Sequence, residues 1–101
     1  SAPDRFLAAL AAGTPERTAA PDARAEAVAR GFAAAPPARL ARMIEAGRLG
    51  EAILAAMRLY DAGRAGDLPD LADALATFRA VGLEDIARRA GLEALLLGPG
   101  R

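Results

Sequence analysis

Hydrophobic residues recur three to four positions apart along most of the chain, and Gly and Pro separate these stretches at helix-sized intervals. This spacing is typical of amphipathic helices, which turn one apolar stripe toward a core. It predicts six helices, near residues 3–12, 22–34, 37–46, 49–62, 68–81 and 83–97, and a further short turn that begins at Thr14. No segment alternates apolar and polar residues as a strand would, so the predicted fold class is all-α.

Particular residues predict where individual helices begin and end. Asp67 has the chemistry of an N-cap, and Pro69 follows it just inside the fifth helix. Gly47, Gly63 and Gly82 are each predicted to stop a helix. We expect the helices to pack as antiparallel hairpins, either in a solenoid segment or in a compact irregular bundle.

The 101 residues correspond to one helical domain that covers positions 1–101. The paired prolines at positions 36 and 37 suggest a boundary inside it, because the residue before a proline leaves the helical region. This boundary separates a less regular N-terminal part, residues 1–36, from two helical hairpins in residues 37–97.

A faint repeat relates the two predicted hairpins. Gly47 and Gly82 lie 82 − 47 = 35 positions apart, and the same offset matches further residues of similar size: Leu40 with Leu75, Ala41 with Ala76, Met43 with Phe78, Ala52 with Ala87, and Ala55 with Ala90. The segments 45–52 (EAGRLGEA) and 80–87 (AVGLEDIA) resemble the inter-helix region of tetratricopeptide-like repeats, whose period is similar. The resemblance covers about residues 40–97. It implies helical-hairpin architecture and a role in holding a protein or peptide, whereas the alternative is that two Ala-rich helix pairs match through composition.

The side-chain inventory predicts that the chain is not an enzyme. It has no His, Cys, Lys, Asn, Gln or Trp, and its only Ser is Ser1. Nucleophilic triads, Schiff-base chemistry and thiolate metal sites therefore lack their residues. Asp61, Asp67, Asp70 and Asp73 form a carboxylate cluster that could attract a hard cation, but acidic residues at a helix start more often cap it. We predict no catalytic, cofactor-binding or metal-binding residue.

The last predicted helix carries the candidate binding residues. Its leucines fall on several faces, and a domain of this size cannot easily bury them all: Leu92, Leu95, Leu96 and Leu97. Arg88 and Arg89, with Arg79, add a candidate basic patch for an acidic partner. We therefore expect a scaffold-like protein-interaction module that binds another protein or peptide through an apolar helix groove, or binds a second copy as a homodimer. A further alternative is a piece of a longer helical-repeat protein.

An alternative function comes from residues 83–92 (LEDIARRAGL), which resemble the first helix and turn of a bacterial helix-turn-helix DNA reader. The segment after Gly91 would be the recognition helix. It contains no Ser, Thr, Asn, Gln or Arg before Pro99, so it lacks the side chains that contact bases or phosphates. The alternative is thus a regulatory domain with a degenerate helix-turn-helix at 83–97, and our first choice includes no nucleic acid.

Charge and hydropathy limit the remaining partners. The formal net charge is +0, so the chain has no general attraction to nucleic acid or anionic membranes, and no apolar run reaches the length of a membrane span. All thirteen basic residues are Arg, which we attribute to a GC-rich, bacterial genome. The start Ser1-Ala2-Pro3 lacks Met and indicates a trimmed or processed chain. The compartment therefore stays open, with the cytoplasm slightly favoured, because a targeting segment could have been removed.

Overall fold

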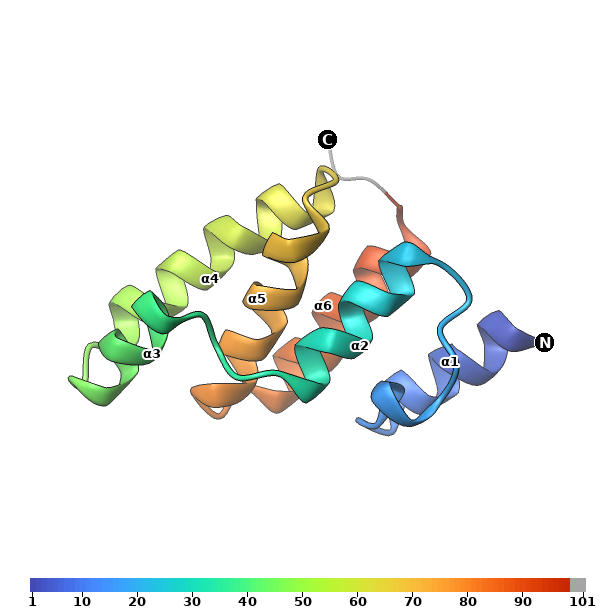
Figure 1. Cartoon of the computed structure of the whole chain (residues 1–101), viewed down its shortest axis with the longest axis horizontal. Helices are drawn as coiled ribbons and strands as arrows, with labels where there is room; N and C mark the ends of the chain where they lie inside the picture. The colour runs from blue at the N-terminus through green and yellow to red at the C-terminus, as the bar shows by residue number, and fades with distance from the viewer. Residues whose placement is uncertain (99–101) are drawn as a thin grey trace.

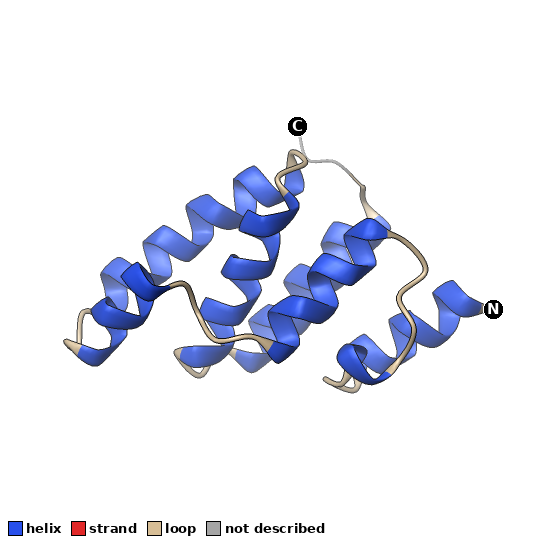
Figure 2. Cartoon of the chain, in the orientation of Figure 1, coloured by secondary structure: helices blue, strands red, loops and turns tan. Residues whose placement is uncertain are grey.

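The computed structural model describes residues 1–98. Within them the chain forms helices and loops with no strand (Figure 2), as the hydrophobic pattern predicted. The elements are α1 (Ala2–Ala11), a short 3-10 turn η1 (Pro15–Arg17), α2 (Ala23–Ala33), α3 (Ala38–Glu45), α4 (Leu49–Arg64), α5 (Leu68–Ala80) and α6 (Glu84–Leu96). The all-α fold class is confirmed, and the predicted helix starts lie close to the observed ones.

Helix α5 occupies the centre of the molecule. It packs most extensively against α4 and α2, and it also contacts α6. Helix α1 lies against α6 at one end, and α3 packs on α4 at the other (Figure 1). The result is a slab with extents of 43 × 28 × 19 Å, in which α4 and α3 form one end and α1 the other.

The core is built largely from alanine, so the helix backbones approach closely. One continuous cluster of buried side chains draws on five helices, with Phe6 and Leu10 from α1, Val28 from α2, Ala56 from α4, Leu75 from α5 and Ala90 from α6 among its members. Glycines lie where helices cross most closely. A Cβ on Gly31 would lie 2.7 Å from the Cβ of Leu75, and one on Gly91 would lie 3.3 Å from side-chain atoms of Leu10 and Val28. Gly91 therefore lies where side chains of α1 and α2 come close to α6.

The two hairpin loops related by the 35-residue offset have the same geometry. Gly47 and Gly82 have φ values of 77° and 85°, which an L side chain rarely adopts. At each loop the residue after the glycine donates its backbone N–H to a carbonyl five residues earlier, in the preceding helix. Arg48 donates to Met43 at 2.8 Å, and Leu83 donates to Phe78 at 2.8 Å. The matched Ala52 and Ala87 are both fully buried. The arrangement is compatible with a helical repeat.

The fourth helix is longer than the sequence predicted. Gly63 does not end α4, which continues to Arg64 and closes at Gly66, where φ is 131°. Gly63 is instead buried where α4 meets α5, and a Cβ there would lie 2.6 Å from the Cα of Leu71. The glycine was wrongly predicted as a stop because close backbone approach, rather than a left-handed turn, requires it.

Candidate partner-binding surface

The four leucines of the last helix divide into two pairs. Leu92 and Leu95 are half-buried and pack against the core cluster. Leu96 and the following Leu97 are 65% and 67% exposed. Helix α6 is therefore not buried all round, and its C-terminal end presents apolar surface to solvent.

An apolar groove lies beside these leucines. It has a volume of about 220 Å³ and is lined by residues from the starts of α1 and α2 and the end of α6: Pro3, Phe6, Leu7, Pro21, Asp22, Ala25, Leu95 and Leu96. Phe6 and Ala25 are buried, so they form a rigid floor, whereas Leu96 is an exposed wall. The carboxylate of Asp22 accepts the backbone N–H of Ala25 at 2.8 Å, which holds it in place as the N-cap of α2. The groove can accept apolar side chains next to one fixed acceptor.

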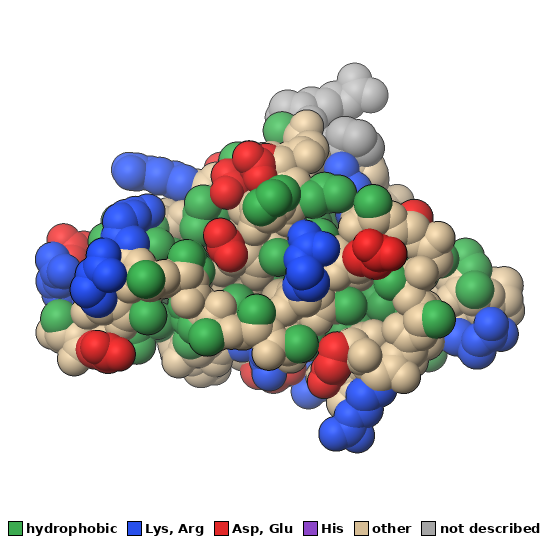
Figure 3. Space-filling model, in the orientation of Figure 1, with side chains coloured by type: hydrophobic (Ala, Val, Ile, Leu, Met, Phe, Trp, Pro, Cys, Tyr) green, Lys and Arg blue, Asp and Glu red, His purple; other side chains and the backbone are tan. Residues whose placement is uncertain are grey.

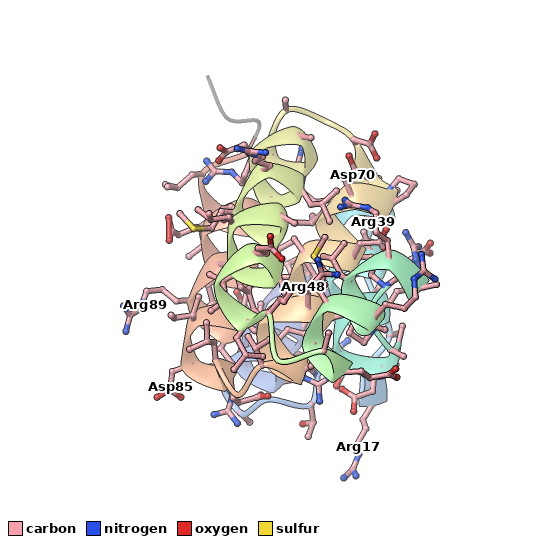
Figure 4. The ribbon with its side chains drawn as sticks, turned by 90° about the vertical axis from the view of Figure 1, so that its left-hand side faces the viewer. Arg17, Arg39, Arg48, Asp70, Asp85 and Arg89 are labelled. Carbon is pink, nitrogen blue, oxygen red and sulfur yellow. The ribbon has the colours of Figure 1, made fainter. Side chains whose placement is uncertain are left out.

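The predicted basic patch is not formed as expected. Arg79 points into the structure, where its Nη1 donates to the carbonyl of Phe32 at 2.8 Å and its Nε lies 3.2 Å from the Glu84 carboxylate. Arg88 binds the other oxygen of Glu84 at 3.1 Å. Only Arg89 of the three is exposed, and it projects outward from α6 (Figure 4). Glu84 thus pairs with both other arginines: its contact with Arg79 joins α5 to α6, and its contact with Arg88 lies within α6.

The single tyrosine is half-buried, and its hydroxyl bonds within the fold. The Tyr60 hydroxyl donates to the carbonyl of Ala90 at 2.7 Å, which ties α4 to α6. Burial raises the pKa of Tyr60, although Arg64, 3.5 Å from the hydroxyl, acts in the opposite direction. The ring also meets Phe78 edge-on with centroids 6.5 Å apart. Its neighbours thus make Tyr60 a packing residue.

The aspartates at the start of α5 act on the helix itself. Asp67 accepts the backbone N–H of Asp70 at 3.0 Å, as the predicted N-cap. The pKa of Asp70 and that of Asp73 are raised, by desolvation first and then by neighbouring aspartates. Among residues 1–98 no group of three or more His, Cys, Asp or Glu side chains is placed to hold a metal ion.

Residues 84–96 form one uninterrupted helix. The DNA-binding alternative requires a turn at Gly91, and this turn is not formed, because Gly91 lies inside α6 and faces Leu10 and Val28. On the face shown in Figure 3, both signs of charge are interspersed with apolar side chains, with Arg gathered mainly at the left end. This end carries α3 and the start of α4, with exposed Arg39, Arg42 and Arg48.

Within the described part of the chain, no helix is long and apolar enough to cross a membrane. No known protein family matches the chain, and neither a curated protein nor a solved structure is similar enough to it to count as a match. Proposals about function therefore depend on the geometry alone.

Proposed function

We propose that this chain is a non-catalytic protein-interaction module whose α1–α6 groove receives an apolar helix or peptide segment. The observation that carries the proposal is the placement of exposed Leu96 as one wall of a groove whose floor is the buried ring of Phe6. Apolar pockets on rigid helices accept alternate side chains of an amphipathic partner, and an aromatic floor supplies contact area without reordering.

The groove also has features that would orient a partner. Asp22 gives it one fixed carboxylate, so a basic or N–H-donating group next to the apolar residues of the partner would bind best. The volume of about 220 Å³ accommodates one or two side chains and is too small for a drug-sized cofactor, whose pockets begin at roughly 300 Å³. A short anchor from a protein thus fits better than a free organic ligand.

Affinity capture from a lysate of the source organism tests this function, with the captured proteins identified by mass spectrometry. Leu96→Glu places a charge on the groove wall, and it should lose a partner that the wild type binds near-stoichiometrically. Ile86→Glu is the matched control, because Ile86 is 44% exposed on the same helix but outside the groove. A partner retained by Leu96→Glu, or lost equally with both variants, would refute the proposed groove.

A further inference from the structure

One face of α4 has features that the isolated chain does not explain. Leu54 and Met57 are 57% and 53% exposed. With 3.6 residues per turn they share the outward side of the helix with other exposed residues: Gly50, Glu51, Arg58 and Asp61. Figure 4 looks onto this end of the molecule, with α4 in front, Arg39 of α3 on one side and Arg89 of α6 on the other.

Charged residues of opposite sign lie on either side of Leu54 along this face. Glu51 lies three residues before Leu54 and Arg58 lies four residues after it, on the same flank of the helix. An antiparallel copy of α4 would therefore bring Glu51 to Arg58 of the other chain, and Arg58 to its Glu51.

Gly50 is the second unexplained feature. Every other glycine in residues 1–98 has a positive φ or a neighbouring atom within 3.3 Å of the place where a Cβ would stand. Gly50 has neither, although glycine is less favourable than alanine in a helix. It lies on the same flank as Met57, so in an antiparallel pair it leaves space for the Met57 side chain of the other copy.

We propose that this chain forms a two-fold symmetric dimer through the outward face of α4, with the helices antiparallel and the axis at Leu54. A two-fold axis perpendicular to the helices brings the same flank of each copy together. Leu54 then meets Leu54, Met57 covers Gly50, and each Glu51 faces an Arg58. In the single chain Glu51 lies 3.4 Å from Arg48, but both side chains are more than half exposed, so this contact is weak and gives way easily.

Charge reversal tests this arrangement, with sedimentation equilibrium as the measurement. The wild type should reach twice the chain mass of 10.3 kDa as concentration rises. Arg58→Glu and Glu51→Arg should each raise the dissociation constant by roughly tenfold or more, because each creates two like-charge contacts. A mixture of these two variants should recover the dimer, since every contact then joins Glu to Arg. A mixture that stays monomeric would overturn the proposal.

Cysteine cross-linking tests the axis itself, because the chain contains no native cysteine. Leu54→Cys should form an intermolecular disulfide at least tenfold faster than Ile86→Cys, an exposed control away from the axis. Equal rates, or a wild type that stays monomeric at all concentrations, would contradict the dimer. Leu96→Glu should leave the dimer unchanged, so failure of the dimer and failure of the groove are separate results. Loss of a different protein on Leu54→Glu would also overturn the proposal by showing another occupant.

Discussion

At the scale of single residues, small side chains determine how closely the helices pack. Gly63 lies against the backbone of Leu71, so a methyl group has no flexible neighbour to displace. We expect Gly63→Ala to lower the free energy of unfolding by about 1–3 kcal/mol, the usual cost of overpacking, measured by urea denaturation at low protein concentration. Gly50→Ala is the control, with nothing within 4 Å, and should gain roughly 0.4–1 kcal/mol. Equal effects of the two would contradict this packing.

Arg79 is the second residue whose position determines its role. It binds the Phe32 carbonyl, pairs with Glu84, and lies over the Phe32 ring at 5.1 Å, so it joins α2, α5 and α6. Arg79→Met keeps the stem but removes these contacts, and should cost about 1–2 kcal/mol after allowance for its 31% exposure. Arg89→Met, in an exposed position, should change the free energy of unfolding by less than about 0.5 kcal/mol. A neutral Arg79→Met would show that the bridge contributes nothing.

At the scale of elements, most of the helical pattern follows from the sequence. The stripe Leu71, Leu75 and Phe78 predicts α5, and all three side chains are buried. Asp67 predicts its start, because N-capping needs only local chemistry. Gly63 is a residue whose role the sequence alone does not determine. A glycine can permit a left-handed turn or a close crossing, and only the position of the neighbouring helix distinguishes the two.

The aspartates at the start of α5 should make the stability of the fold depend on pH. Desolvation and neighbouring aspartates raise the pKa of Asp73. A carboxyl group with a higher pKa in the folded state binds its proton more tightly there, so stability falls as the pH rises through the unfolded and then the folded pKa. Asp73→Asn should therefore have a higher Tm than wild type at pH 7, and the difference should shrink at a pH below both pKa values.

Asp85→Asn is the control for that experiment. Asp85 lies in the first turn of α6, where a negative charge complements the helix dipole, so this variant should lower the Tm at pH 7. Calorimetric scans at several pH values provide the measurement. An Asp73→Asn variant less stable than wild type at pH 7 would mean that the charge of Asp73 is favourable in the fold.

At the scale of the whole molecule, the sequence predicts candidate residues but not the surface they form. The excess of leucine in α6 pointed to Leu96, which does line the groove. The other walls come from Pro3, Leu7 and Pro21, and no local pattern indicates that α1 packs beside the end of α6. Arg79 and Arg88 were expected in a basic patch, but each also donates to a carbonyl of a distant helix, Arg79 to Phe32 and Arg88 to Ala11. Helical periodicity does not predict such contacts between distant segments.

We propose that the α1–α6 groove binds a different protein, and site-specific photo-cross-linking can identify that protein at the groove itself. A photoreactive amino acid would replace Leu96, and Ile86 in a control, in cells of the source organism before mass spectrometry of the adducts. We expect one predominant foreign protein joined at position 96 and absent at position 86. No adduct at position 96, or the same set of adducts at both positions, would contradict it.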